Sequence, residues 1–140
     1  MNIGDSATFS KTISESDVYT FAGITGDFNP LHVNETKAKN TIFKSRIVHG
    51  MLVGSFISTV LGTKFPGPGT IYLEQDLVYK KPVYINDTVT AIVTLSEVID
   101  AEKNIYKFDT IIVNDDNEKV IEGYAVVKVN RPKECENASC

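Results

Sequence analysis

An acid and a base stand five positions apart in the segment Thr-Gly-Asp-Phe-Asn-Pro-Leu-His, residues 25–32. Pro30 fixes its own φ and pushes Asn29 toward an extended conformation. We therefore expect Asp27 and His32 on a short, stiff loop with little freedom to be helical. An acid and a base held on a loop between regular elements can transfer protons to and from a bound substrate.

The same segment also has a purely structural interpretation. Asp-x-Asn-Pro is ordinary turn chemistry, and a single histidine is more often structural or exposed than catalytic. Asn29 is expected to hydrogen-bond locally and to hold the loop. The residues alone therefore leave both proton transfer and a loop staple open.

The residues before this loop predict a strand and a helix. Residues 6–11 read as a short edge strand, and Ser-Glu-Ser-Asp at 14–17 is a capping box that opens a helix. Gly26 can take the positive φ with which a chain often leaves a helix. Apolar and small side chains recur at spacings of three and four, which predicts one buried face: Val18, Phe21, Ala22 and Thr25.

The residues after the loop predict one short and one long helix. Asn34 can cap a short helix to about Lys39, whose polar surface suits a position over the site. Residues 40–48 read as irregular, and the next helix should run over about 49–61. Its apolar residues spread around most of its circumference, which predicts a buried helix. Small residues recur every fourth position, where a strand or a ligand can approach closely: Gly50, Gly54, Ser58 and Gly62.

The second half of the chain predicts an antiparallel sheet. Residues 70–84 alternate, Pro82 suits an edge or an end, and strands follow at 88–99, about 106–112 and 120–129. Short turns join these strands, which favours a meander. Helices followed by strands indicate the α+β class. The positions expected to face inward on the first of these strands are Val89, Ala91, Val93 and Leu95. The next strand is expected to carry Tyr106, Phe108, Thr110 and Ile112.

The composition predicts one soluble domain. The chain has 140 residues and 42% apolar content, with no apolar run of membrane length. Its first residues are neither basic nor apolar enough for a signal peptide, so we expect none. A net charge of −4 argues against a nucleic-acid binder. Cys135 and Cys140 lie in a polar tail, residues 131–140, that we expect to be disordered, and a cytoplasmic setting would keep both reduced. His32 and His49 look too isolated for a metal site, and no glycine-rich loop indicates a redox cofactor.

Two blocks of sequence resemble the MaoC-type (R)-specific enoyl-CoA hydratases, also called hydratase 2. They are Gly26–His32, followed by Ala38, and Arg46–Leu52, and the resemblance covers about residues 5–130. It implies the hot-dog fold, in which an antiparallel sheet wraps around a long central helix. It also implies that Asp27 and His32 are catalytic, that the substrate is an acyl-CoA thioester of fatty acid metabolism, and that the chain forms a homodimer. No cofactor or metal is implied.

Hydration of an enoyl thioester needs a base for water, an acid for the α-carbon and a group that binds the developing oxyanion. Asp27 and His32 could share one water and act as a coupled pair. Gly50, at the start of the long helix, could offer its N–H to the thioester oxygen, a role that the resemblance also implies. The resemblance further implies that Ser58 lines the site. Asn29 is a second candidate for the lining. His49 is a weaker candidate for a further catalytic residue, because a histidine next to a helix cap can be purely structural.

Two other functions stay open at this point. Hot-dog proteins commonly cleave thioesters, so an acyl-CoA thioesterase is one alternative. A non-catalytic acyl-CoA binding protein is the other. A lone sheet with one very apolar helix leaves edges and apolar surface to cover, which favours a dimer and leaves further pairing of dimers open. The cations that could meet the phosphates of coenzyme A are Lys44, Arg46, Lys64, Lys80 and Lys81.

Overall fold

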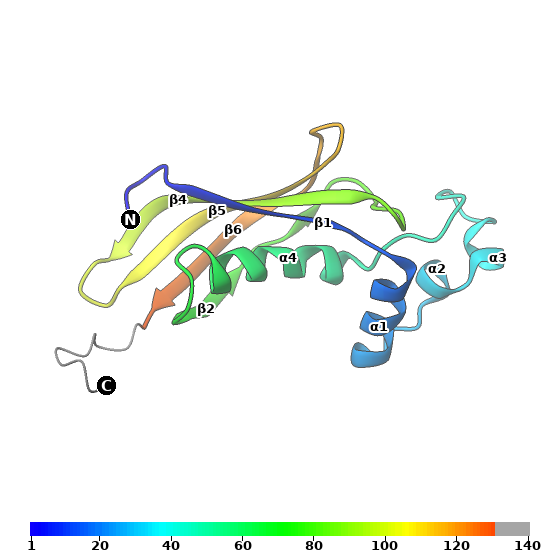
Figure 1. Cartoon of the computed structure of the whole chain (residues 1–140), viewed down its shortest axis with the longest axis horizontal. Coiled ribbons are helices and arrows are strands. Elements are labelled where there is room, and N and C mark those ends of the chain that lie inside the picture. The colour runs from blue at the N-terminus through cyan, green and yellow to red at the C-terminus, as the bar shows by residue number, and fades with distance from the viewer. Residues whose placement is uncertain (131–140) are drawn as a thin grey trace.

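A curved antiparallel sheet lies along the helix α4 (Gly50–Thr63), and three short helices gather beyond one end of the sheet (Figure 1). The computed structural model describes residues 1–130, so the predicted disorder of 131–140 lies outside the described residues. The strands run in the order β1-β4-β5-β6-β2, and β3 also pairs with β6. Their bounds are β1 (Ser6–Thr12), β2 (Thr70–Gln75), β3 (Val78–Tyr79), β4 (Thr88–Asp100), β5 (Ile105–Asn114) and β6 (Lys119–Val129). This is the α+β arrangement predicted from the sequence.

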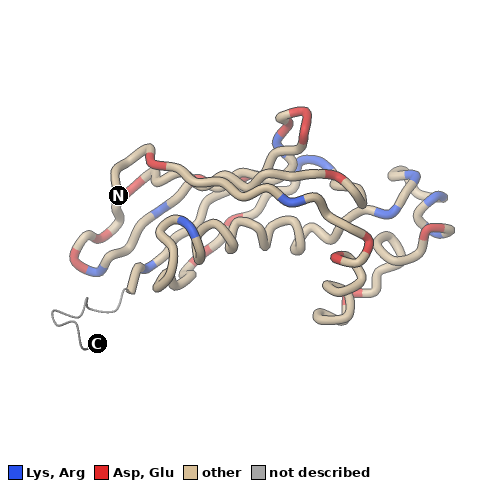
Figure 2. The backbone as a smooth tube through the Cα atoms, in the orientation of Figure 1, with Lys and Arg blue, Asp and Glu red and all other residues tan. Residues whose placement is uncertain are grey.

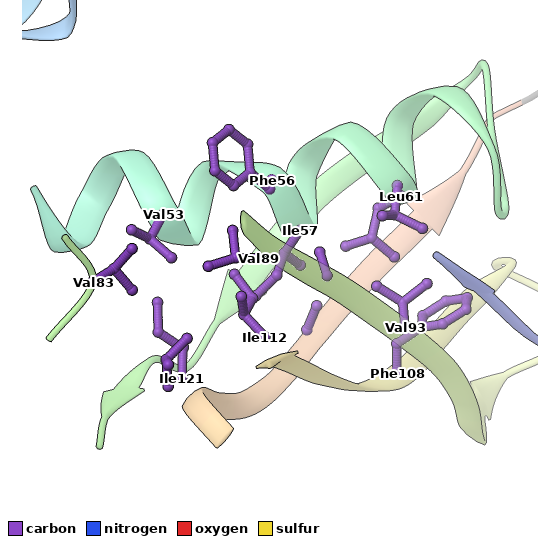
Figure 3. Packing of buried hydrophobic residues seen from close by; sticks show 14 of the residues in the cluster. Val53, Phe56, Ile57, Leu61, Val83, Val89, Val93, Phe108, Ile112 and Ile121 are labelled. Carbon is purple, nitrogen blue, oxygen red and sulfur yellow. The ribbon is translucent and has the colours of Figure 1, made fainter. Parts of the chain in front are cut away.

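The inner face of the sheet and α4 form the core. The alternation predicted on β4 is confirmed, because Val89, Ala91, Val93 and Leu95 are all buried. On β5, Phe108 and Ile112 lie in the same cluster as Ile57 of α4 (Figure 3). Each fully buried side chain of this size contributes roughly 1.5–3 kcal/mol. The orientation of α4 is therefore set by a face that cannot turn away from the sheet.

The polar residue on that face has a partner. Thr110 is fully buried, and its hydroxyl accepts a hydrogen bond from Nε2 of Gln75 at 3.1 Å. A buried hydroxyl without a partner would destabilise the fold. Gln75, at the end of β2, therefore stabilises the core by supplying the hydrogen bond that Thr110 needs.

The prediction of one continuous strand over residues 70–84 is wrong. The segment is broken into β2 and β3, with a bulge between Tyr72 and Glu74, and both pieces pair with β6. The break lies at Asp76, whose carbonyl oxygen would be only 1.9 Å from a Cβ at Gly123. Only a glycine allows the two main chains to approach so closely.

The predicted meander holds only for β4, β5 and β6. The chain leaves β3 and crosses the end of the sheet before it returns as β4 on the other side. This crossing segment is held by Val48, whose N–H donates to the carbonyl of Val83 at 2.7 Å. An isolated bridge between Ile47 and Tyr84 extends the same contact.

The long helix is not buried all round, as its composition had suggested. Val53, Ile57, Val60 and Leu61 face the sheet, but Met51 is 63% exposed. The exposed side also carries Ser55 and Ser58. One side of α4 therefore has no cover within the single chain. With 14 residues it is also too short to cross a bilayer, and no described helix has the length and hydropathy of a membrane span.

The helical end of the molecule begins as predicted. The capping box of α1 (Glu15–Thr25) is confirmed, because Ser14 and Asp17 each accept the other's main-chain N–H. Asn34 caps α3 (Glu35–Ala38) as expected. The predicted buried face of α1 extends over Val18 and Ala22 but not to Thr25, which is exposed at the last turn.

The prediction that the segment from Asp27 to His32 has little freedom to be helical is wrong for the second half of that segment. Residues Pro30–Val33 form a single helical turn, α2, which begins directly after Asn29. Proline is favoured at the first helical position because its φ is already helical and its missing N–H has no partner there. Asn29 caps the turn by accepting the N–H of Leu31 at 3.1 Å.

Arg46 links the helices to the chain that precedes α4. Its guanidinium contacts Glu35 of α3 at 2.8 Å and Glu15 of α1 at 3.3 Å, and it donates to the hydroxyl of Tyr19. The Arg46 side chain is only 16% exposed, so these contacts are screened less than surface pairs. The same residue therefore holds α1 and α3 around the loop that lies between them.

Replacing Arg46 by Met should keep the stem of the side chain and remove all three polar contacts. We expect the free energy of unfolding to fall by about 1–3 kcal/mol, since the carboxylates and the hydroxyl lose a charged donor. Urea unfolding measures this change. Lys44→Met is the matched control, because Lys44 is exposed and makes no side-chain bond among the described residues. Equal stability of the two variants would contradict the role of Arg46.

Candidate active site

The Asp27 loop is shaped by local hydrogen bonds. Gly26 ends α1 in the left-handed conformation, with φ at 80°, and donates its N–H to the carbonyl of Ala22. The N–H of Asn29 donates to Oδ1 of Asp27 at 3.2 Å. Asn29 uses its own side-chain oxygen to cap α2, so its local role is as predicted. Oδ2 of Asp27 accepts no hydrogen bond from the described residues, and the residue is exposed.

His32 presents one ring nitrogen to the protein and one to the site. Nδ1 lies 2.7 Å from the carbonyl oxygen of Ile47. A carbonyl oxygen can only accept, so Nδ1 carries the hydrogen and Nε2 of the neutral ring keeps a lone pair. Burial lowers the pKa of His32, and neighbouring His49 lowers it further, whereas the Ile47 carbonyl and Asp27 raise it. The net direction is downward, so His32 favours the neutral, proton-accepting form at neutral pH.

Asp27 and His32 lie at the separation that one water can bridge. A carboxylate oxygen of Asp27, a ring nitrogen of His32 and one of His49 all lie within 4.8 Å of one another. Two hydrogen bonds of about 2.8 Å through a single oxygen span a similar distance. The sequence prediction that Asp27 and His32 come together is therefore confirmed in space.

His49 is part of the same cluster, which sequence reasoning missed. The His32 and His49 rings are stacked, with centroids 3.9 Å apart and planes 29° apart. Nε2 of His49 lies 2.9 Å from the carbonyl oxygen of Asp27. The two histidines looked isolated because 17 positions separate them, and no spacing rule predicts a contact made through tertiary structure. The contact arises because Ile47 donates its N–H to the carbonyl of Leu31 and joins the two segments.

The cluster is better arranged for proton transfer than for chelating a metal ion. The ligand lone pairs of a metal site converge on one point about 2 Å from each donor atom. Lone pairs of imidazole lie in the ring plane, so two stacked rings direct them side by side instead of toward one ion. Two of the four ring nitrogens are also engaged with main-chain carbonyls.

Gly50 and His32 line the same pocket. Gly50 is the first residue of α4, so its N–H has no acceptor within the helix. The pocket has a volume of about 350 Å³. Most of its other walls are apolar, as a site for an acyl chain requires: Phe43, Val48, Val53, Val83 and Ile121. The predicted oxyanion position and one of the predicted catalytic residues therefore meet at one cavity.

Ser58 lies elsewhere. It lines a second groove of about 320 Å³ between α4 and β2, together with Gly54, Leu73 and Leu77. Two turns of helix separate it from Gly50, a rise of roughly 12 Å. The single chain therefore does not bring Ser58 to the Asp27–His32 pair, and its predicted role stays a prediction.

Most of the cations suggested for phosphate binding already have partners. Arg46 is held by two glutamates, Lys64 donates to the carbonyl of Thr8, and Lys80 and Lys81 pair with Glu122 and Glu118. Among the five, only Lys44 has no such side-chain partner in the part of the chain that is described. Lys80 and Lys81 do lie at the rim of the His32 pocket. Basic residues are interspersed with acidic ones along the backbone and form no continuous stripe (Figure 2).

Comparison with known proteins places this geometry in a family. The (R)-specific enoyl-CoA hydratase of Rhodospirillum rubrum is 53% identical over 126 residues, which cover 90% of this chain and 86% of that protein. The solved (R)-hydratase from A. caviae involved in PHA biosynthesis is 39% identical, with a TM-score of 0.89, and covers 93% of this chain and 98% of its own. The R-hydratase PhaJ1 from Pseudomonas aeruginosa, in its unliganded form, has 36% identity and a TM-score of 0.88 over 94% of this chain and 84% of its own. Residues 2–117 match the family described as MaoC like domain, and the chain belongs to that family.

Proposed function

We propose that this chain is an (R)-specific enoyl-CoA hydratase, a hydro-lyase that adds water reversibly and syn to a trans-2-enoyl-CoA. The observation that carries the proposal is the placement of Asp27 and His32 within one water of each other, with His32 at the pocket that also contains the start of α4. The names of the relatives at 53% and 39% identity support the same reaction. The product is the (R)-3-hydroxyacyl-CoA.

The pair supplies both proton transfers. A water between Asp27 and His32 loses one proton to the pair while its oxygen attacks C3 of the enoyl group. The same proton can then return from the pair to C2, so the pair ends the cycle unchanged. Because the two groups share one water, they are treated as one coupled acid–base unit. The hydroxyl adds to C3 and the proton adds to C2 from the same face of the enoyl group, the face that the Asp27–His32 loop covers. The addition is therefore syn.

The start of α4 supplies the third requirement. Negative charge develops on the thioester oxygen as water adds to C3. The N–H of Gly50 is unpaired within the helix and lies at its positive end, which favours a bound oxyanion. Gly50 also has no Cβ, and a Cβ there would lie 2.6 Å from Cε1 of Tyr79.

Two further expectations from the sequence stay predictions. They are the cytoplasmic location and the single domain over residues 1–130.

One assay tests the reaction directly. The protein is mixed with crotonyl-CoA in D₂O, and the conjugated enoyl absorbance and the free thiol are followed together. The product is then analysed for its configuration at C3 and for the position of deuterium at C2. Loss of absorbance without thiol, with an (R) product labelled syn, supports the hydratase. Release of thiol identifies a thioesterase, and an (S) product or anti label refutes the proposed geometry. A series of enoyl-CoA chain lengths then defines the acyl group.

Substituting either member of the pair should abolish most of the turnover. Asp27→Asn and His32→Gln are close in shape to the native residues, so both should fold. We expect each to lower kcat by about 10²-fold or more, the range for a lost acid or base. The double variant should lose far less than the product of the two, because the residues act as a unit. Stopped-flow hydration kinetics measure this, and near-normal turnover in either single variant would rule out the assigned roles.

A methyl group at Gly50 should act on turnover more than on binding. Gly50→Ala keeps the backbone N–H, but its Cβ would lie 2.6 Å from Cε1 of Tyr79 and would displace the N–H from the thioester oxygen. We expect kcat to fall by up to about 10²-fold, the cost of one lost oxyanion donor. Gly62→Ala is the matched control on the same helix, because a Cβ there would meet no atom within 4 Å apart from those of the adjoining residues and the helix backbone. Steady-state kinetics of both variants test the donor. If folded Gly50→Ala raises KM and keeps its kcat, the oxyanion is bound elsewhere.

We also propose that the chain works as a homodimer. Large exposed apolar side chains gather on the uncovered side of α4 and along β2 and β3, where a second copy could cover them: Met51, Ile71, Tyr72, Leu73, Val78 and Tyr79. Further pairing of dimers is left open by this surface.

A charge placed in this surface should separate the subunits. Leu73→Glu, at a side chain that is 53% exposed in the single chain, should shift the mass in light scattering from two chains to one. Val98→Glu is the control, because Val98 is 44% exposed on β4, away from this surface. A wild-type protein that scatters as a single chain at micromolar concentration would overturn the dimer.

A further inference from the structure

We propose that His49 is the positioning residue of the Asp27–His32 pair: one ring nitrogen holds the main chain of Asp27, and the ring face holds the imidazole of His32. The inference rests on the proposed hydratase function and deepens it. It assigns no contact with substrate to His49.

The bond to Asp27 is the only long-range hydrogen bond that the described residues make to the loop at 25–29. Every other bond of that loop joins residues at most four positions apart. The loop is exposed and follows a helix that ends at Gly26, so local bonds alone leave it free to move as a unit. Nε2–H of His49 donates to the carbonyl of Asp27 at 2.9 Å and ties the loop to the buried start of α4.

The ring face of His49 fixes the second member of the pair. His32 stacks on it at 3.9 Å, and Phe21 of α1 contacts the His49 ring at 4.9 Å. The carbonyl of Ile47 holds Nδ1 of His32 at the same time. Stacking prevents the His32 ring from tilting, and the bond prevents it from flipping, so the direction of its Nε2 lone pair is set by both.

The position of His49 excludes two simpler roles. His49 is the N-cap residue of α4, yet its side chain makes no capping bond to that helix. It is 2% exposed, and its Nδ1 has no hydrogen-bond partner among the described residues. An apolar ring would fill this place without an unpaired acceptor. What the imidazole adds over such a ring is the Nε2–H that reaches Asp27.

Three substitutions separate the bond from the filling of space. Gln carries an amide N–H near the position of Nε2, so His49→Gln keeps a donor within reach of Asp27. Asn has the same amide but is one methylene shorter, so His49→Asn loses the reach. His49→Phe keeps a ring against His32 and loses the donor. The Gln and Asn variants form the matched pair.

We expect His49→Asn and His49→Phe to lower kcat by about 10²-fold, since displacement of a reacting group by about 1 Å can cost this much. KM should change little, because no substrate contact is lost. His49→Gln should recover most of the lost kcat. Three folded variants with equal kcat would overturn the proposal, as would a loss that appears in KM alone.

A measurement without substrate keeps this test independent of the reaction. Backbone ¹⁵N relaxation should show residues 27–29 more mobile in His49→Asn than in His49→Gln, while the two proteins melt at similar temperatures. Equal mobility of this loop in both variants would refute the positioning role. A wild-type protein that fails to hydrate any enoyl-CoA would refute the proposed function, but it would leave the relaxation result valid. If His49→Phe does not fold, the Asn and Gln pair decides the question alone.

Discussion

The packing of α4 against the sheet is the constraint on which the site depends. Ile57, Val60 and Leu61 are fully buried against the inner faces of the strands, so the helix cannot rotate or slide without exposing them. The first residue of α4 and the imidazole just before it are thereby fixed in space. The loop with Asp27 and the turn with His32 then attach to that fixed point through His49 and Ile47. An exposed acid thus shares the rigidity of the core although it contributes nothing to it.

Much of this could be predicted from local patterns. The capping box at Ser14, the inward face of β4 and the start of the long helix near His49 all follow from side-chain periodicity and helix-capping chemistry over a few residues. The Asp27–His32 pair was also found in this way, because both residues lie within one short segment. Patterns of this length carry information on propensity and on which face is buried.

The errors arise where distant segments meet. No pattern within residues 70–84 reveals that Asp76 must pass against Gly123, or that both pieces of the strand pair with β6. The stacking of His32 on His49 and the capture of Arg46 by two glutamates are likewise contacts between separate segments. Pro30 was misread for a different reason, since a rigid φ suits the first turn of a helix as well as it suits a loop.

The carbonyl of Ile47 limits the routes by which His32 can gain or lose a proton. It accepts from Nδ1 of His32 but cannot take a proton in exchange, so the imidazole has no relay into the protein behind it. Any proton that reaches Nε2 must leave by the same atom. Of the three side chains in the cluster, only Asp27 is exposed, so we expect its carboxylate to exchange protons with bulk solvent most readily. In the proposed reaction, isotope exchange at the α-carbon would then depend on how often that carboxylate exchanges its proton with solvent before the proton returns to the substrate.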